Sequence, residues 1–115
     1  MQVLTTALAD ELNRGPARPV QGRAATVRAA ALIQGTAAHA AEVDASCRDA
    51  MVHPGAATTA AARAVGQSVS AGGPDFLHAE VLGCEISTRI GVVMGRLLRH
   101  RTRQSVQASV STPAV

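Results

Sequence analysis

The sequence predicts an all-α fold with four or five helices and no sheet. Apolar residues recur at steps of three and four over several segments, which is the period of one helix face. No segment shows the alternation of apolar and polar residues that marks a half-buried strand. Alanine supplies 24 of the 115 residues, and the chain has one Phe and no Tyr or Trp. We therefore expect a thin core in which alanine-rich helices pack closely, without aromatic anchors.

Four segments carry the helical pattern, and turn residues separate them. The predicted helices cover about residues 2–13, 25–41, 55–70 and 74–103. Gly15-Pro16 ends the first and Gly72-Gly73 ends the third, because these residues favour turns. Pro54 suits the first turn of a helix, where its missing N–H costs nothing. A fifth helix would result if Gly35 divided the second segment.

The last predicted helix carries one apolar stripe, made of Ala79, Leu82, Ile86, Ile90, Val93 and Leu97. Such a stripe normally faces the core. We predict that four members are the most buried large side chains of this helix: Leu82, Ile86, Ile90 and Val93. Gly91 and Gly95, four residues apart, are expected where two helices touch.

The charge of the chain is unevenly distributed, and all eleven basic residues are arginines. Residues 1–95 carry seven arginines and eight acids, a net of −1, whereas residues 96–115 carry four arginines and no acid, a net of +4. A basic end without aromatic residues argues against a nucleic-acid binder. No apolar run approaches the roughly 20 residues of a spanning helix, so no membrane association is expected. The N-terminus does not have the pattern of a signal peptide, so we expect a cytoplasmic protein. In that compartment the two cysteines, which form no CxxC, are expected to be free thiols.

The densest group of chemically active side chains lies between residues 39 and 53. It holds two imidazoles and three carboxylates: His39, Glu42, Asp44, Asp49 and His53. His53 precedes a predicted helix N-terminus, which attracts carboxylates, so the group is suited to moving protons on an anionic substrate. The alternative is a solvated loop in which His53 caps the helix. A metal site that includes Cys47 would match no common zinc spacing, and no metal is predicted.

Three stretches form a longer pattern, namely GTAAHAAEVD at 35–44, VHPGAATTAAARAVG at 52–66 and DFLHAEVLGCEISTRIGVVMG at 75–95. In order and spacing they resemble the MmgE/PrpD family, which includes 2-methylcitrate dehydratase and cis-aconitate decarboxylase. Three residues depart from the family pattern: Gln34 replaces Asn, Ala45 replaces Asp and Cys84 replaces Tyr. The resemblance ends near Arg96.

The resemblance implies that residues 1–95 are the N-terminal part of the family's helical domain. Residues 96–115 are expected to be a divergent, basic and disordered tail. Family members are several times longer and have a second, α/β domain with active-site lysines, whereas this chain has no lysine. We therefore expect an N-terminal fragment, a frameshifted product or a decayed gene copy.

By the same resemblance, the inherited function is lyase or isomerase chemistry on a small di- or tricarboxylic acid, without metal or cofactor. Glu42 or Asp44 and His53 would be catalytic, and His39 would bind substrate. The isolated chain is expected to be inactive, and a homodimer is left open. The alternative is a small helical interaction or oligomerisation protein without catalysis.

Overall fold

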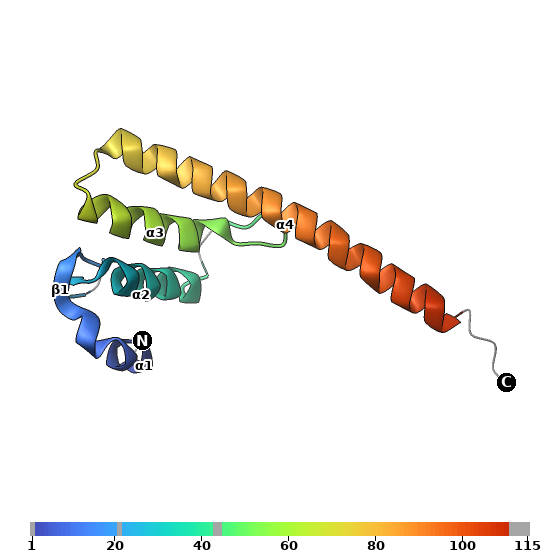
Figure 1. Ribbon diagram of the computed structural model, residues 1–115, viewed down its shortest axis with the longest axis horizontal. Helices are drawn as coiled ribbons and strands as arrows, with labels where there is room; N and C mark the ends of the chain where they lie inside the picture. Colours follow the sequence, from blue (N-terminus) through green and yellow to red (C-terminus); the bar gives the residue numbers. More distant parts are fainter. Residues whose placement is uncertain (1, 21, 43–44, 111–115) are drawn as a thin grey trace.

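The computed structural model describes residues 2–20, 22–42 and 45–110, with side chains up to Leu97. The chain is mostly helical (Figure 1). The described residues form four α-helices, namely α1 (Gln2–Ala7), α2 (Val27–Ala40), α3 (Pro54–Ser68) and α4 (Gly73–Val110). A 3₁₀ turn, η1 (Ala9–Glu11), and a short strand, β1 (Leu12–Ala17), lie between α1 and α2. Within the described residues no sheet forms, although β1 departs from a purely helical chain.

The first predicted helix is wrong beyond Ala7, because the chain turns to pair with the segment that precedes α2. The backbone N–H of Asn13 donates to the carbonyl of Ala24 at 2.6 Å, and that of Thr26 donates to the carbonyl of Glu11 at 3.1 Å. Asn13 has a φ of 60°, which no α-helix contains. These tertiary hydrogen bonds outweigh the local helical periodicity, which is only a weak preference.

Helix α2 is one continuous helix, so Gly35 does not divide it. Thr26 caps its start, where the hydroxyl accepts from the N–H of Ala29 at 3.2 Å. A Cβ on Gly35 would lie 3.5 Å from the Cβ of Ala60 on α3, an ordinary van der Waals distance. The glycine therefore lies at the contact between two helices and not at a break.

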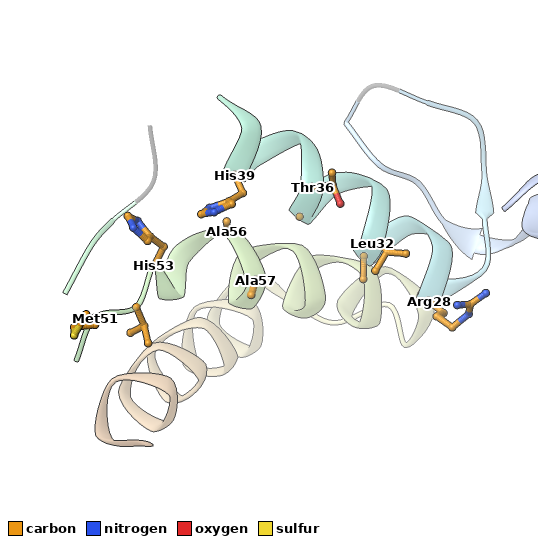
Figure 2. Close-up of a pocket in the computed structure, with 11 residues that line it drawn as sticks. Arg28, Leu32, Thr36, His39, Met51, His53, Ala56 and Ala57 are labelled. Carbon is orange, nitrogen blue, oxygen red and sulfur yellow. The ribbon is translucent and has the colours of Figure 1, made fainter. Parts of the chain in front are cut away.

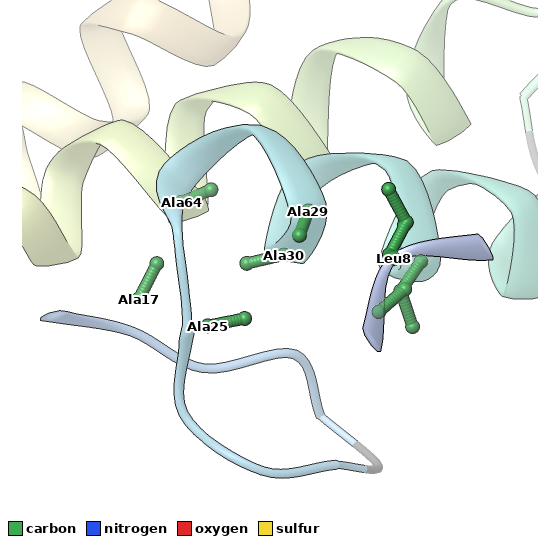
Figure 3. Packing of buried hydrophobic residues seen from close by; sticks show 7 residues of the cluster. Leu8, Ala17, Ala25, Ala29, Ala30 and Ala64 are labelled. Atoms are coloured by element: carbon green, nitrogen blue, oxygen red, sulfur yellow. The ribbon is translucent and has the colours of Figure 1, made fainter. Parts of the chain in front are cut away.

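Helix α3 is the middle layer, with α2 on one side and α4 on the other (Figure 1). Strand β1 contacts both α2 and α3 at one end of the pair. Small side chains dominate the core cluster, which consists of Leu8, Ala17, Ala25, Ala29, Ala30, Ile33 and Ala64 (Figure 3). The thin alanine core expected from the composition is thus confirmed.

The prediction for the apolar stripe of α4 is wrong. Leu82, Ile86, Ile90 and Val93 are 61%, 56%, 59% and 56% exposed. The face that packs on the rest of the chain is made mostly of small and polar residues instead, together with the half-buried Phe76 and Val92. A Cβ on Gly91 would lie 2.6 Å from the carbonyl oxygen of Ala50, and one on Gly83 would lie 2.8 Å from Thr58. The backbone of α4 approaches its neighbours closely, and only small side chains fit there.

Helix α4 also runs further than expected, to Val110, through most of the segment predicted to be disordered. No glycine or proline interrupts the sequence from Arg96 to Val110, so nothing local ends the helix. The chain is consequently elongated, with extents of 66 × 34 × 22 Å and a radius of gyration of 19.4 Å. A compact domain of this length would have about 13 Å. Among the described residues, no helix has the length and apolar character needed to cross a membrane.

Candidate functional site

A cavity of about 720 Å³ lies between α2, the start of α3 and the segment before it (Figure 2). Helix α2 contributes side chains spaced three and four residues apart, which fall on one helix face: Arg28, Leu32, Gly35, Thr36 and His39. The opposite wall comes from Met51, Val52, His53, Ala56 and Ala57. The volume is in the range of a small-molecule site, and the lining is mostly apolar with a few polar groups.

His39 and His53 meet at one end of this cavity. Their ring centroids are 5.4 Å apart and the ring planes are inclined by 68°, an edge-to-face arrangement. His39 lies in the last turn of α2 and His53 is the residue before α3. Both side chains belong to exposed residues. Two imidazoles from separate elements therefore lie within reach of one small ligand (Figure 2).

The first turn of α3 lines the same cavity through Ala56 and Ala57. His53 occupies the N-cap position and makes no capping hydrogen bond with its side chain. N–H groups in the first turn of a helix have no acceptor within the helix, and the helix dipole is positive there. The cavity thus combines a helix N-terminus with two imidazoles, and among the residues that the structure describes no carboxylate lines it. This arrangement favours an anion.

Arg28 lies at the opposite end of the α2 face from His39 (Figure 2). Its guanidinium forms an ion pair with Glu11, which also accepts a hydrogen bond from the hydroxyl of Thr26 at 2.5 Å. Part of its charge is therefore already compensated. The arginine is anchored at the rim and contributes less to anion binding than a solvated guanidinium would.

The predicted site residues have different positions in the structure. His39 and His53 line the cavity together. Glu42 is exposed, follows α2 with a φ of 54°, and is not part of the lining; its N–H donates to the carbonyl of His39 at 3.1 Å. Asp44 lies outside the described residues. Asp49 is exposed on the segment that leads to Met51.

Metal coordination has no support in the part of the chain that the structure describes. There, no three His, Cys, Asp or Glu side chains come close enough together to hold an ion. Cys47 and Cys84, both half-buried, are free thiols.

Sequence reasoning missed Arg28, Thr36, Ala56 and Ala57 as lining residues. Thr36 and Arg28 could have been found from the helix period, because they precede His39 by three and by eleven residues and so share its helix face. The two alanines carry no chemical signal of their own. They line the cavity because the helix that begins at Pro54 is directed toward it.

A sequence model of the MmgE/PrpD N-terminal domain matches residues 2–115. The chain belongs to the MmgE/PrpD family. The match includes residues 96–115, where the sequence analysis placed a divergent segment. Comparison with curated proteins found no match, and comparison with solved structures found none.

Two of the three MmgE/PrpD stretches converge on the cavity. The first supplies Gly35, Thr36 and His39 from α2, and the second supplies His53 and the first turn of α3. The third stretch lies on α4, where Gly83 packs against Thr58 and Glu85 pairs with Arg89 at 2.6 Å. The family pattern therefore divides into two stretches that form the cavity and one that supports α3.

Proposed function

We propose that the cavity between α2 and α3 binds a small di- or tricarboxylate, the substrate class of the MmgE/PrpD lyases. The observation that carries this proposal is the pairing of His39 with His53 beside the first turn of α3. The helix N-terminus and the imidazoles together favour carboxylate oxygens. The apolar wall formed by Leu32 and Val52 suits the carbon skeleton of such an acid.

Within this proposal, His53 transfers a proton and His39 orients a carboxylate of the substrate. In a dehydratase, a base removes the proton from the carbon beside a carboxylate, and an acid protonates the departing hydroxyl. The second proton transfer belongs to Glu42 or Asp44, which follow α2 directly. The family relationship supports these roles, which make the reaction acid/base chemistry of the 2-methylcitrate dehydratase or cis-aconitate decarboxylase type.

The isolated chain is proposed to bind without catalytic turnover. Proton abstraction beside a carboxylate builds negative charge on the substrate, and fixed positive groups must stabilise that charge. The resemblance assigns this role to lysines, and this chain has none. Arg28 does not replace them, because Glu11 already occupies its guanidinium. We place the protein in the cytoplasm, where the free thiols of Cys47 and Cys84 would stay reduced.

A second candidate function, a helical interaction protein without catalysis, is favoured by one observation. Large apolar side chains are exposed along α4, which is unusual for a helix with no further role.

Calorimetric titration of the full chain with cis-aconitate tests the binding proposal. We expect saturable binding that weakens about tenfold or more in His53→Ala and in His39→Ala, because each loses a hydrogen bond to a charged group. His78→Ala is the matched control, since His78 is exposed on α4 and does not line the cavity. Tricarballylate, a saturated tricarboxylate, should bind, and its trimethyl ester should not.

Two results would contradict the proposal. Equal affinity of the His39 and His53 variants and of the wild-type chain would place the ligand elsewhere. Turnover of 2-methylcitrate or cis-aconitate that is lost in His53→Ala would show that the chain is a complete catalyst.

A further inference from the structure

The cavity between α2 and α3 is larger than a small tricarboxylate needs. Its volume is about 720 Å³. The non-hydrogen atoms of cis-aconitate, about twelve in number, fill roughly half of that space even at the ~30 Å³ that one water molecule occupies in the liquid. A ligand that fills the cavity therefore carries more atoms than cis-aconitate does.

The cavity is also long. Arg28 and His39 both line it from α2, and their separation along the helix axis is about 16 Å at 1.5 Å per residue. Figure 2 shows the two histidines at one end, with Leu32 and Arg28 toward the other. The longest carbon chain of cis-aconitate measures at most about 6 Å, with bonds of about 1.5 Å. An acid of this size held by the imidazoles thus leaves the end near Leu32 and Arg28 unfilled.

The two ends of the cavity differ in polarity. The imidazoles and the first turn of α3 lie at one end, whereas Ala31, Leu32 and Arg28 line the other. Leu32 is 45% exposed and offers apolar surface to a ligand. The guanidinium of Arg28 is paired with Glu11. This end is therefore better suited to an uncharged apolar group than to a second carboxylate, whose desolvation the paired arginine would compensate only in part.

We propose that the ligand of this cavity is a di- or tricarboxylate with an unbranched alkyl substituent of about eight carbons. Its carboxylates lie at the imidazoles, and its alkyl chain runs along α2 over Leu32 toward Arg28. An extended chain of eight carbons measures roughly 10 Å, which matches the rise of α2 between Leu32 and His39. This inference rests on the proposed binding of carboxylates and adds the class of substituent.

Calorimetric titration of the full chain with succinate, 2-butylsuccinate and 2-octylsuccinate, below the concentration at which micelles form, measures the effect of chain length. The three acids share one dicarboxylate head. We expect the affinity to rise about two- to fourfold for each added methylene, because each methylene leaves water for an apolar wall.

Leu32→Ser locates the alkyl chain. We expect this variant to lose about fivefold or more in affinity for 2-octylsuccinate and to bind succinate as the wild-type chain does, because only the longer acid reaches Leu32. Leu32→Met should restore the affinity, since methionine offers a similar apolar surface. Val65→Ser is the matched control, because Val65 is 50% exposed on α3 and does not line the cavity.

His53→Ala separates this inference from the proposed function. It should weaken the binding of all three acids by a similar factor and leave the gain per methylene unchanged. Equal affinities for the three acids, together with cis-aconitate binding that depends on His53, would overturn the alkyl substituent alone. A gain with chain length that Leu32→Ser leaves intact, or that Val65→Ser reduces equally, would also overturn it. Absence of binding by cis-aconitate and by all three acids would contradict both proposals.

Discussion

His39 and His53 are fourteen positions apart, yet their rings lie side by side at one end of the cavity, with centroids 5.4 Å apart. Two features of the local structure bring these rings together. Helix α2 continues through Gly35 far enough to carry His39 to its last turn, and Pro54 starts α3 directly after His53. Each imidazole is thus held at the end of a helix, where neighbouring backbone groups are polar. The chemistry of the site depends on where these two helices end and begin.

Thr26 makes two side-chain hydrogen bonds at the start of α2. Its hydroxyl accepts from the N–H of Ala29 and donates to Glu11, so it joins the start of α2 to the preceding turn. We expect Thr26→Ala to lower the free energy of unfolding by about 1–2 kcal/mol, the range for loss of a helix cap. Urea denaturation at one fixed protein concentration measures this change. Thr6→Ala on the exposed side of α1 is the control, and an equal effect of both substitutions would refute the role.

At the scale of elements, the position of α3 between α2 and α4 depends on close approach. Gly83 and Gly91 let the backbone of α4 come near Thr58 and Ala50. Two threonines of α3 reinforce this contact, because the hydroxyl of Thr59 donates to a carboxylate oxygen of Glu80 at 2.7 Å and that of Thr58 does so at 3.2 Å. Small residues and hydrogen bonds therefore form much of the contact between α4 and the rest of the chain, beside the half-buried Phe76 and Val92.

Gly91→Ala tests this account of the packing. Alanine is favoured over glycine inside a helix by about 1 kcal/mol. At Gly91, however, the added Cβ would lie 2.6 Å from the backbone oxygen of Ala50, which cannot easily move. We expect a net loss of stability of about 1–3 kcal/mol, the usual cost of overpacking.

Gly35→Ala is the matched control, because its Cβ would meet its neighbours at 3.5 Å. Thermal denaturation of both variants measures the change, and Gly35→Ala should be neutral or stabilising. A Gly91→Ala variant as stable as Gly35→Ala would show that α4 does not approach the segment around Ala50 closely.

The helices were largely predictable from sequence, whereas the face of α4 that packs was not. Periodicity locates an apolar stripe, but it does not say whether that stripe meets the body of the chain or a partner. The positions of Gly91 and Gly95 indicated the packed face of α4 better than the apolar stripe did, since both glycines are buried. Gly91 packs against the segment around Ala50, and not against another helix as expected. Similarly, the chain around β1 pairs with the segment before α2 through hydrogen bonds from Asn13 to Ala24 and from Thr26 to Glu11, which no local pattern encodes.

The cavity was predictable only in part, for a related reason. His39, Glu42 and His53 lie within one short region of the sequence. In the structure the two histidines line the cavity together, whereas Glu42 is exposed and does not line it. Which side chains share a cavity depends on the angle between α2 and α3. The two helices are in contact where Gly35 lies against Ala56 and Ala60, which are distant from it in the sequence.

The whole molecule consists of a small alanine-rich body and a helix that extends well beyond it (Figure 1). The body positions the cavity, whereas α4 presents the apolar stripe on the outside. A thin core of small side chains offers little hydrophobic stabilisation for each residue buried.

The central claim, that the cavity between α2 and α3 binds a carboxylate, is tested most directly by mapping ligand contacts residue by residue. We expect titration of the ¹⁵N-labelled chain with cis-aconitate to shift the backbone amide signals of Thr36, His39, His53, Ala56 and Ala57. The amide of Ala71, which lies beyond the far end of α3, should stay unchanged. Saturable shifts confined to the cavity residues would support the account. An unchanged spectrum at millimolar cis-aconitate, or shifts centred on α4 instead, would contradict it.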